Sequence, residues 1–202
     1  MKLRAQPINC TLKADPGTPS STDAMIALLA GEFKACGVEV AETIRVAALN
    51  VAPGVTSDEG NGDEWPGVRA KILEADIFIF GTPIWMGQPS SVAKRVLERM
   101  DAFLGETDPQ GRMPSYSKVA VVAIVGNEDG AHHTSAEIFQ SLNDTGWTIP
   151  AVAACYWVGE AMGSIDFKDL KATPKKVSET AKMVARNAVH LAGLLKAAPF
   201  PG

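Results

Sequence analysis

The chain has 202 residues, of which 46% are hydrophobic and 21% charged, and its formal net charge is −4. This length and composition are typical of one globular domain and exclude a long disordered segment. The acidic balance, without a cluster of Lys and Arg, argues against nucleic-acid binding, and no apolar run reaches the roughly 20 residues that span a bilayer.

The cysteines and the first residues bear on redox chemistry and location. Cys10, Cys36 and Cys155 are far apart and lack C-x-x-C spacing, which argues against a disulfide scaffold, a zinc site or an iron–sulfur cluster. We expect all three to be small buried hydrophobes. Residues 5–10 supply no apolar signal-peptide core, so the sequence predicts a cytoplasmic protein.

The first half of the chain predicts strands at 8–12, 38–47 and 76–80, each short, apolar and rich in β-branched or aromatic residues. Pro7 lacks an N–H, so the first strand either begins after it or starts irregularly. A helix is expected to begin near Ser20 and to end at Gly37, and a second helix is expected over 63–74. The inward residues of these helices are expected to be Met25, Leu28, Leu29, Phe33, Val68, Ile72 and Leu73.

The second half continues the alternation of strands and helices. A helix capped by Ser90 or Ser91 should reach 104, and strands should follow at 118–125 and 148–157. Thr173 should cap the last helix, with Pro174 in its first turn and apolar residues at alternating steps of four and three. The pattern predicts an α/β fold with a doubly wound parallel sheet, and 1–202 is expected to form a single domain.

Ligands of such sheets bind beyond the carboxyl ends of the strands, so the loops that follow the strands are the candidate sites. The loop after the first strand is rich in hydroxyl groups and ends at a helix N-terminus, which favours a phosphate. Thr11, Ser20, Ser21 and Thr22 can donate hydrogen bonds there. A plain helix cap in a flexible loop explains any one of these residues equally well.

The loop after the third strand, 81–91, combines two glycines and two prolines with Trp85. A rigid turn of this kind can read the edge of a flat heterocycle with backbone groups, while Ile84, Trp85 and Met86 contact its face. The alternative is that Trp85 only packs beneath a loop.

The polar turn 126–133 follows the fourth strand and is placed to border the same ligand. His132 and His133 are adjacent, so on a helix they point about 100° apart and cannot easily share a metal. Each histidine either packs and hydrogen-bonds locally or donates a proton at the ligand.

The segments 8–13, 76–85 with 91–95, and 125–132 resemble the flavodoxin-like NAD(P)H-dependent FMN reductase and quinone reductase superfamily, and the resemblance extends to Glu160. It implies a three-layer fold with five parallel strands in the order 2-1-3-4-5. It also implies FMN as cofactor, NADPH or NADH as co-substrate, and a small-molecule acceptor such as a quinone or free flavin. A homodimer or homotetramer is a further implication.

The resemblance also assigns residues to the cofactor. The phosphate would contact Thr11, Lys13, Ser20, Ser21 and Thr22, and the ring and ribityl chain would contact Thr82, Pro83, Ile84, Trp85, Met86 and Gly87. The other flavin edge would meet Gly126, Asn127, Glu128, Asp129 and Gly130, with Trp157 and Gly159 at the rim. No catalytic acid or base is assigned, because backbone N–H groups can stabilise the charge of reduced flavin.

Two other functions remain compatible with the sequence. A flavodoxin-like electron carrier would bind FMN without turning over nicotinamide, and a regulatory domain would keep the fold without flavin. G-x-S-x-G, G-x-x-x-x-G-K and a complete G-x-G-x-x-G are absent, which argues against a hydrolase, an NTPase and a Rossmann dinucleotide site.

Overall fold

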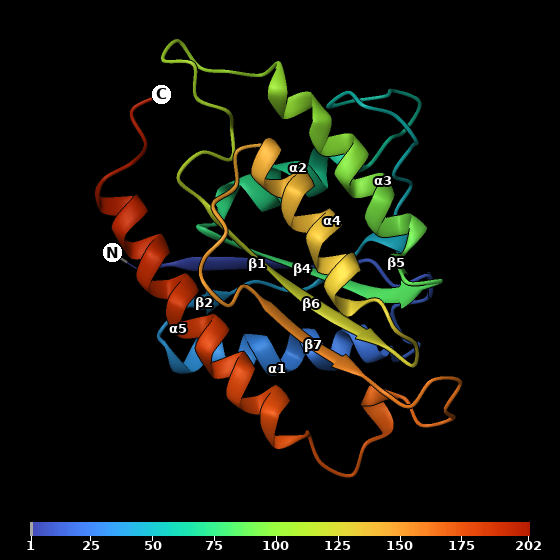
Figure 1. Cartoon of the computed structure of the whole chain (residues 1–202). Coiled ribbons are helices and arrows are strands. Elements are labelled where there is room, and N and C mark those ends of the chain that lie inside the picture. Colours follow the sequence, from blue (N-terminus) through green and yellow to red (C-terminus); the bar gives the residue numbers. More distant parts are fainter. Residues whose placement is uncertain (1) are drawn as a thin grey trace.

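A parallel sheet lies at the centre of the computed structural model, which describes residues 2–202 (Figure 1). Its main strands are β1 (Arg4–Asn9), β2 (Glu39–Val40), β4 (Ile77–Trp85), β6 (Val119–Gly126) and β7 (Ala154–Val158). They are hydrogen-bonded in the order β2-β1-β4-β6-β7. This is the predicted 2-1-3-4-5 order, because β4, β6 and β7 are the third, fourth and fifth of the main strands.

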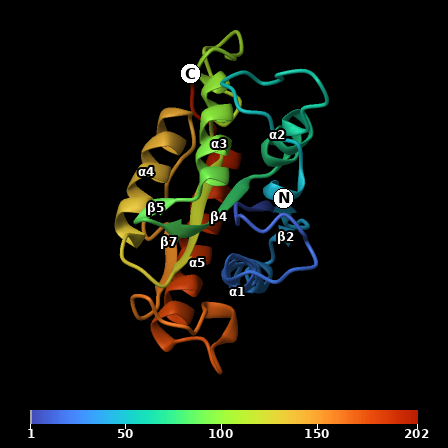
Figure 2. The same cartoon turned by 90° about the vertical axis from the view of Figure 1, so that its right-hand side faces the viewer.

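Helices cover both faces of the sheet. One face carries α1 (Ser21–Ala35) and α5 (Lys175–Ala197), and the other carries α2 (Trp65–Glu74), α3 (Ser91–Met100) and α4 (Ala131–Asp144) (Figures 1 and 2). Short 3₁₀ helices lie at Val46–Ala48, Asp101–Leu104 and Phe167–Asp169. The predicted three-layer arrangement is confirmed.

Strand β6 shows why helices must cover both faces of the sheet. Its side chains alternate between faces, as in any strand. Val119, Val121, Ala123 and Val125 pack in the core under α1 and α5, while Ala120, Val122 and Ile124 pack in the core under α2, α3 and α4. A strand that is apolar at every position is therefore buried on both sides.

The first strand includes Pro7, contrary to the expectation that it spans 8–12. Beside β1 the sheet edge is interrupted: Arg4 pairs with Glu39 of β2, and Ile8 pairs with Ile44 of β3 (Ile44–Arg45), with one extra residue between. Gln6 Nε2 donates to the Glu42 carbonyl in this gap at 2.9 Å. A residue without an N–H is tolerated opposite an irregular edge. The same interruption divides the predicted strand 38–47 into two pairs of residues.

The third predicted strand, 76–80, is too short. Pairing with β6 continues to Pro83 opposite Val125, and β4 then folds back onto β5 (Gln88–Pro89). Met86 and Gly87 form the turn with φ values of 54° and 73°. Positive φ at both central residues is the geometry of a type I′ hairpin. Most of the expected loop 81–91 is therefore strand, because 81–85 belong to β4 and 88–89 to β5.

Other expectations need smaller corrections. Cys10 and Cys155 are buried but Cys36 is exposed, because it ends α1 at the surface. The last helix begins one residue later than predicted, since its N-cap is Pro174 rather than Thr173. The strand predicted at 148–157 is confined to β7, because Ala151 and Val152 lie in a turn. Within residues 2–202 the structure contains no helix with both the length and the hydropathy to cross a membrane.

Candidate functional site

A cavity of about 530 Å³ opens at the carboxyl ends of the strands, the edge that faces the viewer in Figure 2. The loops after β1, β4 and β6 all contribute to it, as the sequence predicts. The predicted residues that line it are Thr11, Lys13, Ser20, Ser21, Thr22, Pro83, Ile84, Trp85, Met86, Gly126, Asn127 and Glu128. Leu12 and Val125 also line it and were not predicted.

One end of the cavity is built from the N-terminus of α1. Ser20 caps the helix: its Oγ accepts from the Asp23 N–H at 3.1 Å, and the Asp23 carboxylate accepts from the Ser20 N–H at 3.0 Å. The first N–H groups of a helix have no acceptor within it, which leaves those of Ser21 and Thr22 to a ligand or water. Lys13 Nζ lies beside them, 3.0 Å from the Pro19 carbonyl. This set of donors fits a phosphate group.

The other end of the cavity carries the hairpin turn after β4. Glu128 holds this turn in place, since its carboxylate accepts from the N–H groups of Met86 and Gly87 at 3.1 Å each. Trp85 is 52% exposed and Met86 is 88% exposed, so neither side chain is packed beneath the loop. The alternative that Trp85 only packs under the turn is therefore wrong.

Glycines allow the loops around the cavity to approach each other. A Cβ on Gly126 would lie 2.9 Å from the Ile84 Cβ, closer than side chains pack, so the end of β6 can lie this close to β4 only because residue 126 has no side chain. A Cβ on Gly130 would lie 2.6 Å from the Gly87 Cα. The backbones of Gly87 and Gly130 thus lie close together, which places the loop after β6 against the hairpin turn.

Four predicted residues do not line the cavity. Besides Gly87 and Gly130, these are Thr82, which is buried and accepts from the Ser90 N–H at 3.2 Å, and Asp129, which is exposed. Thr82 belongs to the strand that carries the site and Asp129 lies on the outer side of its loop. Thr82, Gly87 and Asp129 are each adjacent in sequence to a cavity residue, and Gly130 is two residues beyond Glu128.

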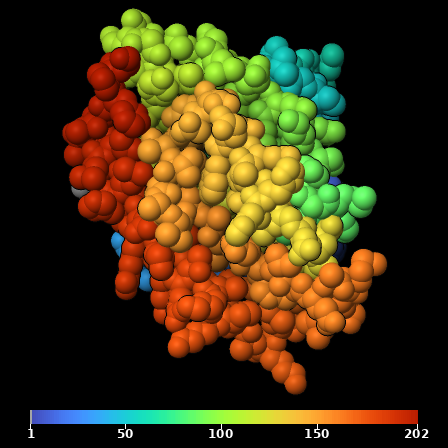
Figure 3. Space-filling view, viewed as in Figure 1, coloured from blue at the N-terminus to red at the C-terminus, as the bar shows by residue number. Residues whose placement is uncertain are grey.

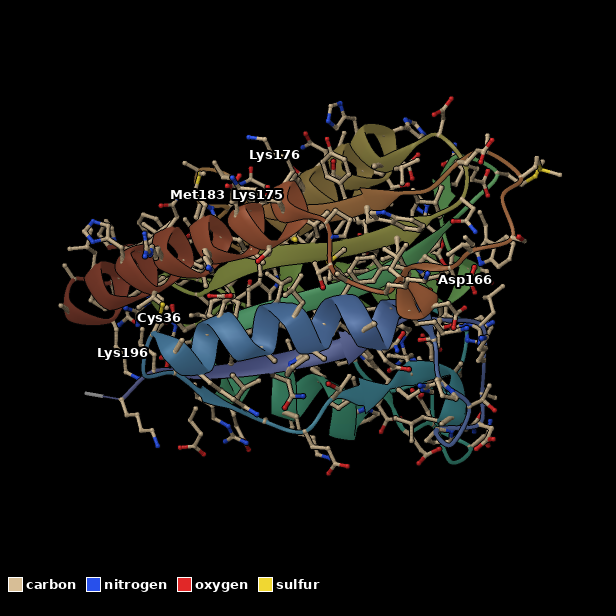
Figure 4. The ribbon with its side chains drawn as sticks, turned by 90° about the horizontal axis from the view of Figure 1, so that it is seen from below. Cys36, Asp166, Lys175, Lys176, Met183 and Lys196 are labelled. Atoms are coloured by element: carbon tan, nitrogen blue, oxygen red, sulfur yellow. The ribbon has the colours of Figure 1, made fainter. Side chains whose placement is uncertain are left out.

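The loop after β7 adds a wall that sequence reasoning did not assign. Trp157 lines the cavity as expected at its rim, and Met162, Gly163, Asp166 and Phe167 join it. Figure 4 shows Asp166 beside the N-terminal end of α1, and the orange loop after β7 projects at the lower right of the space-filling view in Figure 3. The signal was available, because this loop also follows the carboxyl end of a strand.

Asn127 joins this wall to the rest of the site. Its Nδ2 donates to the Gly163 carbonyl at 3.1 Å and to Asp166 Oδ1 at 3.2 Å. Gly159, predicted at the rim, packs against the same amide: a Cβ there would lie 2.5 Å from Asn127 Oδ1. The loops after β6 and β7 therefore form one connected surface.

The two histidines lie outside the cavity. His132 Nε2 is 3.0 Å from the Tyr156 hydroxyl, and His133 Nε2 is 2.9 Å from the Glu137 carboxylate. The interpretation that they hydrogen-bond locally is confirmed. Among residues 2–202, no three His, Cys, Asp or Glu side chains come together in a way that could hold a metal ion.

Burial and hydrogen bonding set the charge of two groups near the cavity. Burial raises the pKa of the Cys10 thiol, so Cys10 is not a thiolate nucleophile at neutral pH. Burial by itself would also raise the pKa of Asp23, but hydrogen bonds from Ser20 and Asn9 and the charge of Arg45 lower it overall. Asp23 is therefore ionised at the first turn of α1.

Comparison with known proteins places this site in a family. A model of the NADPH-dependent FMN reductase family matches residues 9–161. The chain is 31% identical to the 8-demethyl-8-aminoriboflavin-5'-phosphate synthase of Streptomyces davaonensis, over 99% of this chain and 81% of that protein. It is 35% identical to a Mycobacterium bovis protein named divalent metal cation transporter MntH, over 96% of this chain, but it spans only 29% of that longer relative.

Solved structures agree in fold. RosB with the bound intermediate 8-demethyl-8-formylriboflavin-5'-phosphate superposes with a TM-score of 0.88 at 29% identity, covering 99% of this chain and 82% of that one. An archaeal flavodoxin superposes with a TM-score of 0.59 at 10% identity, over 95% and 99% of the two chains, which confirms the flavodoxin-like fold. The description of the matched family model names NADPH and FMN, in agreement with the predicted co-substrate and cofactor. The chain belongs to the NADPH-dependent FMN reductase family.

Proposed function

We propose that the chain binds FMN in the cavity at the carboxyl edge of the sheet and passes hydride equivalents from NADPH or NADH to a quinone, a free flavin or a similar acceptor. One observation carries the proposal. The hydrogen-bond donors at the N-terminus of α1, which suit a phosphate, and the exposed Trp85–Met86 turn line the same cavity. A ligand with a phosphate at one end and a flat ring at the other can therefore contact both.

In this proposal Thr11, Lys13, Ser20, Ser21 and Thr22 bind the phosphate. The positive charge of Lys13 and the N–H groups at the start of α1 complement a phosphate dianion. The isoalloxazine ring and ribityl chain contact the second set, which consists of Pro83, Ile84, Trp85, Met86, Gly126, Asn127 and Glu128. The predicted residues Thr82, Gly87, Asp129 and Gly130 support these contacts from the adjoining backbone.

Flavin supplies the redox chemistry when bound, accepting hydride and passing it on. The chain's own residues bind and orient the ring and leave the face beside Trp85 open to solvent, with Trp85 half exposed. An exposed face of the ring would allow a nicotinamide and then an acceptor to bind there in turn. No catalytic acid or base is assigned to the chain in this proposal, because the cofactor would supply the redox chemistry.

A second candidate treats flavin phosphate as the substrate. The 31% identity to 8-demethyl-8-aminoriboflavin-5'-phosphate synthase and the intermediate bound to RosB favour it, because both names describe a flavin phosphate whose ring position 8 is altered. The same cavity would then hold the flavin while its ring is modified. An FMN-binding electron carrier is the third candidate and differs from the first in lacking nicotinamide turnover.

The experiment is an anaerobic titration of the FMN-reconstituted protein with NADPH and NADH, followed by the visible flavin spectrum. Rapid bleaching supports the reductase, and a panel of quinones then defines the acceptor. Bound flavin that resists both nicotinamides supports the carrier, and a change in flavin mass during incubation supports flavin modification. Failure to bind FMN contradicts all three.

A homodimer or homotetramer and a cytoplasmic location stay predictions. Sedimentation of the purified protein would test the predicted oligomeric state.

A further inference from the structure

Arg45 lies behind the loop that follows β1 and does not line the cavity. It is the last residue of β3, paired with Asn9 of β1, and its side chain is 8% exposed. Nη1 donates to three backbone carbonyls of the loop, those of Lys13 and Asp15 at 3.2 Å and that of Thr18 at 3.0 Å. The guanidinium therefore attaches the loop to β3 through three of its backbone carbonyls.

The Asp15 carboxylate accepts from the Gly17 N–H and the Thr18 hydroxyl at 2.8 Å each, so these bonds shape the turn of the loop, whereas Arg45 attaches that turn to β3. Asp15 and Thr18 each precede a proline, so two of the three peptide groups that Arg45 binds have no N–H. Residues 12–19 are exposed at the surface and bury no apolar side chain. A guanidinium has five donors in one plane and can serve several carbonyls at once, which a lysine ammonium cannot do in the same geometry.

Arg45 also balances a charge at the site. Nη2 forms an ion pair with the carboxylate of Asp23, which lies in the first turn of α1 beside Ser20. Asp23 is ionised, as described above, and an unbalanced carboxylate here would repel a phosphate at the same helix end. The ion pair with Arg45 removes that repulsion.

We propose that Arg45 is a positioning residue that sets the preference of this site for phosphorylated flavin over riboflavin. It acts through the loop 13–18 and through Asp23, without touching the flavin. This inference rests on the proposed FMN site. It predicts that a change at Arg45 weakens the binding of the phosphate and leaves the binding of the isoalloxazine ring unchanged, because the ring contacts the loops after β4 and β6.

The test compares FMN and riboflavin as ligands of the apoprotein, using fluorescence titration of wild type, Arg45→Lys and Arg45→Gln. We expect the Kd for FMN to rise at least about tenfold in both variants, while the Kd for riboflavin stays within about twofold. A fall in the stability of the variants would not by itself produce this split, since it would weaken both ligands alike.

Arg99 offers a matched control. It is buried, forms an ion pair with Asp63 at 2.6 Å, and donates to the carbonyls of Ala52 and Thr56 at 2.9 Å each. Its chemistry is that of Arg45, but the loop it holds is not part of the cavity. Arg99→Lys should lower stability and leave the ratio of the two dissociation constants at the wild-type value.

The outcomes separate the inference from the function on which it rests. An unchanged ratio in folded Arg45 variants overturns the inference alone, whereas a wild type that binds neither flavin overturns the FMN site and the inference together. Limited trypsin digestion of the wild-type apoprotein covers the case in which the variants do not fold. We expect the bond after Lys13 to resist cleavage, and rapid cleavage there in folded protein would show that Arg45 does not hold the loop.

Discussion

Glu128 and Met86 are 42 residues apart in the sequence, yet the Glu128 carboxylate accepts the Met86 N–H at 3.1 Å and the next N–H at the same distance. This contact joins the turn after β4 to the loop after β6. Met86 has a φ of 54°, an uncommon conformation for a residue with a side chain, so the turn depends on such external support. The geometry of the ring-binding end of the cavity therefore depends on Glu128.

Replacing Glu128 tests this dependence. We expect Glu128→Gln to lose one of the two hydrogen bonds and to raise the Kd for FMN roughly tenfold, since hydrogen bonds to a charged group contribute about 1.5–3 kcal/mol. Riboflavin should be affected equally, because the loss is at the ring end. Glu98→Gln on α3 is the matched control, as Glu98 is exposed and does not line the cavity. Equal affinities of the two variants would contradict the role of Glu128.

Lys13 provides a test at the phosphate end. We expect Lys13→Met to weaken FMN about tenfold and to leave riboflavin unchanged, because the ammonium is beside the helix N-terminus that would bind the phosphate. The difference between Lys13→Met and wild type should shrink as salt concentration rises, since Lys13 is exposed. Lys34→Met, at the far end of α1, is the control and should bind FMN as wild type does. Isothermal titration at two salt concentrations measures all of these effects.

Gly126 tests the close approach of β4 and the end of β6. Gly126→Ala would place a methyl group 2.9 Å from the Ile84 Cβ, and we expect it to destabilise the apoprotein by about 1–3 kcal/mol. Gly67→Ala on α2 is the control, because a Cβ there meets no atom within 4 Å and a helical alanine stabilises by roughly 0.5–1 kcal/mol. Urea denaturation measures both. Equal stabilities of the two variants would show that the loop has room to move away.

The buried pair of Arg99 and Asp63 predicts a pH dependence of stability. Burial by itself would raise the pKa of Asp63, but Arg99 and the N–H groups of Glu59, Trp65 and Ala52 hold that pKa well below its usual range. A lowered pKa in the folded state stabilises the protein above the unfolded value of about 3.9, and this stabilisation is lost as pH falls below it.

Asp63→Asn should therefore lower the free energy of unfolding at pH 7 by about 3–5 kcal/mol, because it leaves Arg99 buried without its partner. The variant should also lose less stability than wild type between pH 5 and pH 3, the approximate window over which an unfolded carboxyl titrates. Urea denaturation at both pH values measures the two slopes. Parallel slopes would exclude Asp63 as a source of the acid sensitivity.

Local patterns in the sequence determined the class of fold and the edge that carries the site. The run 119–125 is apolar at every position, as a strand buried on both faces requires. Ser20 and Gly37 mark the ends of a helix by the cap conformations they favour. The rule that ligands lie beyond the carboxyl ends of parallel strands then identifies the loops after β1, β4 and β6.

Only the tertiary structure decided which residues of those loops line the cavity and what supports them. Thr82 and Trp85 are three residues apart, yet one is buried behind the site and the other half exposed in it, because β4 continues along β6 past the expected end of the strand. Asp166 enters the cavity from the loop after β7, and Arg45 reaches across 27 residues to the Thr18 carbonyl. Such contacts depend on the packing of distant segments, which residue spacing along the chain does not encode.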